Sequence, residues 1–210
     1  MENEFWVKRW TDRNISFHEE GGNELLKKNL LYLSLQTNDR LLLPLCGMSL
    51  DIDYLLNSGF RVIGVELFEK AVIELFSRLN IEPKIRQLKN CKSYYSESLE
   101  ILVGDLFQID KDEIGHVDAV YDRASLVALP HTMREKYYQH IMHISKLSPQ
   151  LLITYLFEDN NYQSPPFSIE DHEIESSYSQ YSSIELKEVI RLSKGLKGCS
   201  VVDEKIWLMK

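Results

Sequence analysis

The sequence is short of cysteine, of long apolar runs and of positive charge. Its three cysteines, Cys46, Cys91 and Cys199, form no CxxC pair, which argues against a disulfide framework or a zinc ribbon, so we expect reduced thiols and no metal site. No apolar run approaches the roughly 20 residues of a membrane-spanning helix, and the charged N-terminus lacks the apolar core of a signal peptide. We therefore expect a cytoplasmic protein that contacts no membrane.

Basic residues are outnumbered, because 24 Lys and Arg face 32 Asp and Glu, which gives a formal net charge of -8. Phosphate backbones are bound by basic surfaces, so this balance argues against a general nucleic-acid binder. The 210 residues are 44% hydrophobic. A chain of this size buries about 70% of its unfolded surface and needs no disulfide or metal to fold. We expect a single domain over residues 1–210.

Short continuous apolar runs alternate with amphipathic stretches through the middle of the chain. We predict strands over residues 41–45, 61–67, 99–103, 117–121 and 151–157, and helices over 50–57, 69–79, 132–147 and 169–178. Two more strands, 184–192 and 201–209, follow one another closely and predict a hairpin. The expected fold is α/β: a doubly wound, mostly parallel, seven-stranded Rossmann-like sheet with helices on both faces and a C-terminal antiparallel hairpin.

The ligand site of such a sheet lies beyond the carboxyl ends of its strands. The turn after the first strand has one glycine, Gly47, where the GxGxxG fingerprint has three, which argues against NAD and FAD. Glu66 ends the second strand 19 residues later, where an acidic side chain accepts hydrogen bonds from ribose hydroxyls. The pattern favours a nucleoside without a pyrophosphate, such as S-adenosylmethionine. Alternatively, Glu66 is an ordinary strand-terminal acid.

Arginine and tryptophan near the expected site have both a binding and a structural interpretation. Arg123, just after the fourth strand, either clamps a carboxylate with its planar fork of donors or forms a structural ion pair with Asp122 or Glu66. Trp6 and Trp10 are spaced i, i+4 near the N-terminus. They belong either to the core-facing stripe of a helix or to a lid that stacks on a cationic ligand.

Five segments carry a resemblance to a known family: FWVKRWTDRNISFHEEGGNELL, LLPLCGMSLD, GVELFEKAV, YDRASLVALP and SPPFSIEDHEIE. Together, in this order and at this spacing, they resemble the thiopurine S-methyltransferase family, with the bacterial branch closest. The match runs from about residue 4 to the C-terminus. The resemblance implies a monomeric class I S-adenosylmethionine-dependent methyltransferase that methylates small aromatic or heterocyclic thiols by in-line displacement.

The resemblance also implies roles for particular residues. It assigns cofactor binding to Trp10, Leu45, Glu66, Leu106 and Arg123. Arg123 is also the catalytic candidate, because displacement at an activated sulfonium mainly needs positioning and electrostatics. Phe17 matches an aromatic residue that closes over the cofactor and the substrate, and we place Trp6 with it on the substrate side. The implied organisation is an N-terminal helical lid (1–35), a cofactor-binding core (36–157) and a segment (158–210) that contains a substrate wall and the hairpin.

The sequence departs from the family pattern at two places. Met48 stands where the family usually has a lysine after the glycine, which removes a charge near the cofactor. The family's basic residue that faces the substrate has three candidates here, Arg191, Lys194 and Lys197. Pro165-Pro166-Phe167 is either a pocket wall or a plain connector. Other functions also stay open: methyl transfer to halide or other small inorganic anions or to selenium or tellurium species, and cofactor binding without catalysis.

Overall fold

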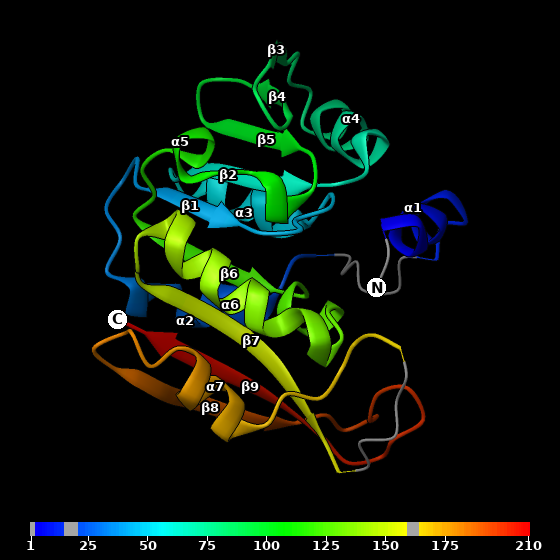
Figure 1. The fold of residues 1–210 in the computed structure, drawn as a ribbon, viewed down its shortest axis with the longest axis vertical. Helices are drawn as coiled ribbons and strands as arrows, with labels where there is room; N and C mark the ends of the chain where they lie inside the picture. Colours follow the sequence, from blue (N-terminus) through cyan, green and yellow to red (C-terminus); the bar gives the residue numbers. More distant parts are fainter. Residues whose placement is uncertain (1–2, 15–20, 159–163) are drawn as a thin grey trace.

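The computed structural model describes residues 3–14, 21–158 and 164–210, and these are built around a nine-stranded sheet (Figure 1). The strands are β1 (Arg40–Leu43), β2 (Arg61–Glu66), β3 (Lys84–Gln87), β4 (Lys92–Tyr95), β5 (Leu99–Val103), β6 (Ala119–Arg123), β7 (Gln150–Phe157), β8 (Ile184–Arg191) and β9 (Val202–Met209). Their order across the sheet is β3-β4-β5-β2-β1-β6-β7-β9-β8.

The five strands β5, β2, β1, β6 and β7 run parallel, as their apolar runs predict. From β1 the chain moves outward through β2 towards one edge, and at β6 it returns to the other side of β1. The strand order therefore reverses between β1 and β6. Connections that leave these two strands in opposite directions open a crevice at their carboxyl ends, which is where ligands bind in such sheets.

Two antiparallel pairs complete the sheet. The expected C-terminal hairpin is present, with β9 between β7 and β8 and antiparallel to both. The expected number of seven strands is wrong, because β3 and β4 form a second antiparallel pair next to β5 at the opposite edge. These strands have four residues each and β3 is exposed along its whole length, so no apolar run marks them in the sequence.

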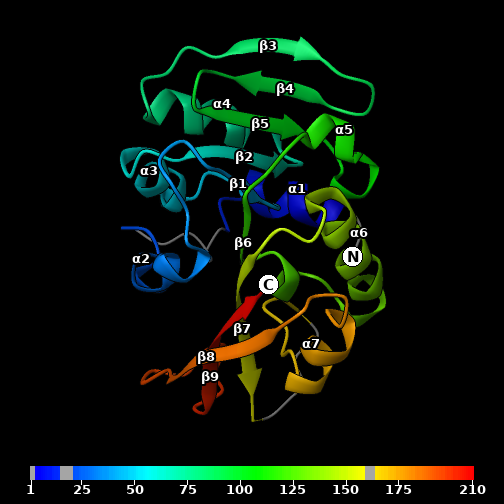
Figure 2. The ribbon, with the colours of Figure 1, turned by 90° about the vertical axis from the view of Figure 1, so that its left-hand side faces the viewer.

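Helices cover both faces of the sheet, as predicted. They are α1 (Asn3–Thr11), α2 (Glu24–Asn29), α3 (Leu50–Asn57), α4 (Glu69–Arg78), α5 (Lys111–Ile114), α6 (His131–Ser145) and α7 (Asp171–Ser177). Figure 2 shows α2 and α3 on one side of the sheet and α5, α6 and α7 on the other. Within the described ranges, no helix combines the length and the apolarity needed to cross a bilayer.

Alternate residues of the central strands enter two separate cores. In β1, Leu42 packs with α5, α6 and α7, whereas Leu41 and Leu43 pack with α2, α3 and α4. All three leucines are buried. Burial of each such side chain stabilises the fold by roughly 1.5–3 kcal/mol, so a strand between two helical layers must be apolar on both faces. The helix α1 belongs to neither helical layer and lies beyond the carboxyl ends of β2 and β5 (Figure 1).

Candidate active site

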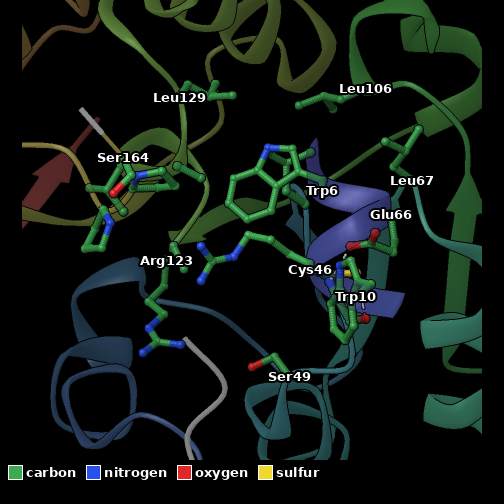
Figure 3. Close-up of a pocket in the computed structure, with 18 of the residues that line it drawn as sticks. Trp6, Trp10, Cys46, Ser49, Glu66, Leu67, Leu106, Arg123, Leu129 and Ser164 are labelled. Carbon is green, nitrogen blue, oxygen red and sulfur yellow. Dashed lines mark hydrogen bonds between the residues drawn. The ribbon is translucent and has the colours of Figure 1, made fainter. Parts of the chain in front are cut away.

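A cavity of about 620 Å³ opens where the strand order reverses, and Figure 3 shows its lining. Its walls come from the ends of β1, β2 and β6, from α1, and from residues 164–166, 192, 196–197 and 204. A cavity of this size suits a small molecule. Six residues named from the sequence line it: Trp6, Trp10, Leu45, Glu66, Leu106 and Arg123. Phe17, the remaining candidate, lies outside the described residues.

Glu66 is a buried carboxylate at the end of β2, with 5% of its surface exposed. One oxygen, Oε2, accepts the Gly47 N–H at 2.9 Å, and the other, Oε1, accepts the Phe68 N–H at 2.7 Å. Burial raises the pKa of Glu66, and the hydrogen bonds from backbone N–H groups oppose that rise. A carboxylate oxygen can accept more than one hydrogen bond. Glu66 therefore retains capacity for ligand hydroxyls while it anchors the turn after β1.

Gly47 lets the ring of Trp10 lie directly on the turn after β1. The backbone of Gly47 has φ +55°, and a Cβ atom placed there would lie 2.9 Å from Cζ2 of Trp10. The Trp10 ring is also stacked with Phe68, at a centroid distance of 6.0 Å and an interplanar angle of 12°. Trp10 is thus both a packing residue that holds α1 on the sheet and a cavity-lining residue, so its two interpretations from the sequence are compatible.

Replacing Gly47 with alanine is expected to displace Trp10, to destabilise the fold by about 1–3 kcal/mol and to weaken cofactor binding. Gly198→Ala is a matched control, because Gly198 has φ +83° and nothing within 4 Å of an added Cβ. Both variants carry the backbone strain, and only Gly47→Ala carries the steric clash. Urea unfolding and cofactor titration of both variants measure the difference, and equal losses in the two would show that the Trp10 contact is unimportant.

Arg123 ends β6 and lines the cavity. The turn that follows is tied to the turn after β1, because the Ser125 hydroxyl donates to the Pro44 carbonyl at 2.5 Å. Leu45 comes next and has a left-handed backbone, with φ +46°. A buried side-chain hydrogen bond therefore joins the turns beside Leu45 and Arg123, which both line the cavity.

Asp122, an ion-pair partner for Arg123 in one interpretation of the sequence, binds other groups on the opposite side of β6. Its oxygens accept the Tyr137 hydroxyl at 2.6 Å and the Leu126 N–H at 3.3 Å. Burial raises the pKa of Asp122 from 3.8 to about 6, although these hydrogen bonds oppose the rise. The carboxyl group holds the base of the loop that carries Arg123, and its charge changes close to neutral pH.

This raised pKa predicts a pH-dependent contribution to stability. A carboxyl group whose pKa is raised by folding favours the native state at low pH, and that contribution is lost as the pH rises from about 4 through about 6. Asparagine does not ionise, so the Asp122→Asn variant lacks this pH-dependent loss of stability. The free energy of unfolding of the wild type relative to Asp122→Asn should therefore fall between pH 5 and pH 7.5, by about 1.4 kcal/mol per unit of pKa difference at most. Urea titrations at both pH values test this, and a constant difference would contradict it.

An arginine from α4 holds the loop that contains Met48. The Arg78 guanidinium donates to the Met48 carbonyl at 2.6 Å and to the Ser49 carbonyl at 3.2 Å, and it pairs with Asp53 at 2.5 Å. A positive charge therefore reaches this loop from a different element, although position 48 itself is apolar. The sequence does not reveal this role of Arg78, because a basic residue at the end of an amphipathic helix carries no signal of its target.

The two ends of the cavity differ in chemistry, and we call them its first and second compartments (Figure 3). Around the ends of β2 and β5, the lining residues Leu67, Leu106 and Phe107 form an apolar slot beside the Glu66 carboxylate. Asp105 caps the short turn before them, since its side chain accepts the Phe107 N–H at 3.0 Å. An apolar slot next to a carboxylate suits a nucleoside, with the flat base in the slot and the ribose hydroxyls on the acid.

The other compartment lies towards β7 and β9. Pro165 and Pro166 line it, so these two residues belong to a pocket wall, as one interpretation of the sequence has it. Phe167 is not a lining residue, and its ring lies against the Arg134 guanidinium.

Lys197 also lines the cavity, whereas Arg191 pairs with Asp203 at 2.5 Å. Burial lowers the pKa of Lys197, and so does the nearby Arg9, which reaches the cavity from α1. Of the three basic candidates, Lys197 is the one that lines the cavity. Arg9 also lines it, and no sequence motif marks that position.

Metal ligation has no support in the described part of the chain, where no group of three or more His, Cys, Asp or Glu side chains could hold an ion. Burial also raises the pKa of the Cys46 thiol well above its usual range. Cys46 is accordingly a neutral lining residue rather than a reactive thiolate.

Comparison with known proteins identifies the family of this chain. The family model described as thiopurine S-methyltransferase matches residues 1–210. The chain belongs to the thiopurine S-methyltransferase family. Its relatives include the thiopurine S-methyltransferase of Teredinibacter turnerae, 39% identical over 207 residues, which cover 99% of this chain and 96% of the relative. That of Acinetobacter baylyi is 37% identical over 190 residues, covering 89% and 88% of the two chains.

Solved structures show the same fold at low sequence identity. A 1,6-didemethyltoxoflavin N1-methyltransferase from Burkholderia thailandensis, crystallised with S-adenosylhomocysteine, has a TM-score of 0.67 at 15% identity, covering 99% of this chain and 86% of that one. A TehB-like methyltransferase from Corynebacterium glutamicum has a TM-score of 0.56 at 14% identity, with coverage of 99% and 97%. The chain is thus an S-adenosylmethionine-dependent S-methyltransferase with a class I methyltransferase fold.

Proposed function

We propose that this enzyme transfers the methyl group of S-adenosylmethionine to the sulfur of small aromatic or heterocyclic thiols of the thiopurine type. The observation that carries the proposal is one cavity with two compartments. One has the Glu66 carboxylate and an apolar slot, and the other has proline walls and the cations Lys197 and Arg9. When bound, the cofactor supplies a methyl group on a sulfonium, which is already an activated leaving group.

The residues of the first compartment fit the cofactor. Glu66 has spare acceptor capacity for the two ribose hydroxyls, and Leu106 forms part of the slot for the adenine. Leu45 and Trp10 enclose the cofactor from the turn after β1 and from α1. Arg123, two strands away from Glu66 in the sheet, clamps the carboxylate of the methionine part. Arg123 is also the proposed catalytic residue, because this clamp fixes the sulfonium relative to the acceptor.

The second compartment fits a flat acceptor that reacts through sulfur. Trp6 lines the cavity, with its ring perpendicular to that of Phe5. We propose that Trp6 and Phe17 cover the acceptor, although Phe17 lies outside the described residues. Lys197 and Arg9 favour the anionic form of the sulfur, since a positive charge within a few ångströms stabilises a thiolate. A heteroaromatic thiolate is a strong nucleophile towards a sulfonium methyl group.

We further propose a division of labour along the chain: a lid over residues 1–35, a cofactor-binding core over 36–157 and a substrate wall over 158–210. The enzyme acts as a monomer on a small molecule, without nucleic acid or membrane partners. The net charge of -8 supports the exclusion of nucleic acid. A cytoplasmic location is supported by the Cys46 and Cys91 thiols, which form no disulfide.

The test is turnover by the purified enzyme with S-adenosylmethionine and a panel of acceptors that includes 6-mercaptopurine, thiophenol, iodide, bisulfide and selenite. We expect S-methylation of the two aromatic thiols, and we expect iodide and bisulfide to compete poorly with them. Preference for an inorganic acceptor would replace the proposed substrate class. Tight cofactor binding without turnover on any acceptor would instead indicate a binding module.

A further inference from the structure

A glutamate on β9, Glu204, faces the second compartment of the cavity, which we call the acceptor compartment because the proposed function places the methyl acceptor there. Glu204 lines the cavity and is 9% exposed. In the antiparallel β7–β9 pair it lies directly opposite Tyr155, which lines the cavity as well. Opposite residues in such a pair project to the same face with Cβ atoms about 5 Å apart. Glu204 and Tyr155 therefore form one wall of the acceptor compartment.

Asp203, Glu204 and Lys205 are consecutive charged residues of β9, and only Glu204 lines the cavity. Asp203 and Lys205 project to the opposite face, as adjacent residues of a strand must. Asp203 pairs with Arg191 at 2.5 Å, and Lys205 pairs with Asp171 at 2.5 Å. The direction of Glu204 into the cavity is thus fixed by the register of β9, and it does not depend on the side-chain rotamer alone.

Glu204 lies far from the first compartment, which holds Glu66 and the proposed cofactor site. Glu66 ends β2 and Glu204 lies on β9, four strands away in the order β2-β1-β6-β7-β9. At about 4.8 Å per strand, the two acids are about 19 Å apart across the sheet. Among the described lining residues the remaining carboxylate, Asp105, caps a backbone turn on the cofactor side. Glu204 is therefore the carboxylate of the acceptor end.

A carboxylate on an otherwise apolar and cationic wall has a clear chemical use. Burial of an acid costs several kcal/mol before its partners offset the loss of water, so packing alone does not favour an acid in a wall. Heteroaromatic thiols exist largely as thiones, in which a ring nitrogen next to the C=S carbon carries the proton. The sulfur becomes a stronger nucleophile as that proton leaves. Lys197 and Arg9 are suited to the sulfur, and neither can accept the proton.

We propose that Glu204 accepts the ring N–H proton of thione acceptors during methyl transfer, an inference that rests on the proposed S-methylation. The N–H proton passes to the Glu204 carboxylate, and the N–H electron pair becomes the N=C double bond. The C=S π pair moves to sulfur and forms the new S–CH₃ bond as the bond between methyl and sulfonium breaks. The products are the methyl thioether and S-adenosylhomocysteine, and Glu204 then releases its proton to solvent.

The experiment compares Glu204→Gln with the wild type on two acceptors. 6-Mercaptopurine carries the ring N–H, whereas 4-nitrothiophenol has no ring nitrogen and ionises readily by itself. The amide of the variant would still accept a hydrogen bond but would not take a proton. We therefore expect kcat on 6-mercaptopurine to fall by about 10- to 100-fold, and the fall on 4-nitrothiophenol to be at least about fivefold smaller. Glu204→Asp should restore part of the loss.

Binding supplies a readout apart from turnover. Calorimetric titration of 6-mercaptopurine into enzyme that is loaded with S-adenosylhomocysteine should give a dissociation constant for Glu204→Gln within about threefold of the wild type, because the hydrogen bond is retained. Asp203→Asn is the matched control, since it removes the adjacent acid on the opposite face of β9, and it should leave both acceptors unaffected.

Equal losses on the two acceptors, or wild-type kcat on 6-mercaptopurine, would overturn the proton-acceptor role of Glu204. A binding loss as large as the loss of kcat would likewise overturn it and would make Glu204 a structural wall residue. Failure of the proposed function is distinguishable, because the wild type would then methylate neither acceptor.

Discussion

Replacing Glu66 with alanine is expected to weaken S-adenosylmethionine binding by about 2 kcal/mol, close to 30-fold. Two effects combine. The variant loses the acceptor for the ribose hydroxyls, and it leaves the N–H groups of Gly47 and Phe68 without the carboxylate that now accepts them at 2.9 and 2.7 Å. Because Gly47 supports Trp10, the wall of α1 also becomes less well fixed. Calorimetric titration of the cofactor measures the loss.

A nearby acid provides the control for this experiment. Glu69 begins α4 three residues later, and its carboxylate binds Lys92 and the Tyr94 hydroxyl instead of lining the cavity. Glu69→Ala should therefore leave the cofactor affinity close to that of the wild type. Unchanged affinity in Glu66→Ala would remove Glu66 from the cofactor site.

Arg123→Lys is expected to raise the KM for S-adenosylmethionine by about 10-fold or more, although the charge is kept. A guanidinium binds a carboxylate through two parallel hydrogen bonds, whereas an ammonium acts as a point charge on a flexible stem. The loop that carries Arg123 is fixed by the bonds of Asp122 and Ser125, so the backbone cannot move to compensate. Steady-state kinetics with the cofactor varied give the KM.

Arg61→Lys is the matched control, because Arg61 is an exposed residue at the start of β2, away from the cavity. It should keep the KM of the wild type. If Arg123→Lys also keeps that KM, the clamp is refuted, and the proposed catalytic role of Arg123 falls with it.

The elements that could be predicted from the sequence are those with strong local signals. The helix α3 has the predicted bounds, Leu50–Asn57, because Ser49 caps its first turn and Gly59 follows its end with φ +83°. The strands β1, β2 and β5 stand out because most of their residues are buried and apolar, as expected for strands that are covered on both faces. The strand β3 has neither signal. It forms only because β4 and β5 offer an edge to pair with, which is information from distant parts of the chain.

The site divides in the same way. The positions of Glu66 and Arg123 at the cavity could be predicted, because the strand ends of a doubly wound sheet meet at one edge and position along the chain therefore implies position in space. Arg78 and Glu204 could not be predicted, and Lys197 could not be chosen from the three basic candidates. Arg78 reaches the Met48 carbonyl from the end of another helix, and the other two depend on how the C-terminal hairpin packs beside β7. The predicted role of Phe17 stays a prediction.

The proposed reaction methylates sulfur, and the atom that carries the methyl group in the product shows directly whether it does. The fold alone does not decide the atom, since the solved structures of similar fold include N-methyltransferases. The measurement is the ¹³C NMR spectrum of 6-mercaptopurine after incubation with the enzyme and S-adenosylmethionine labelled with ¹³C in its methyl group. Transfer to sulfur predicts one labelled S-methyl signal. A labelled N-methyl signal, or no labelled product from enzyme that binds the cofactor, would contradict it.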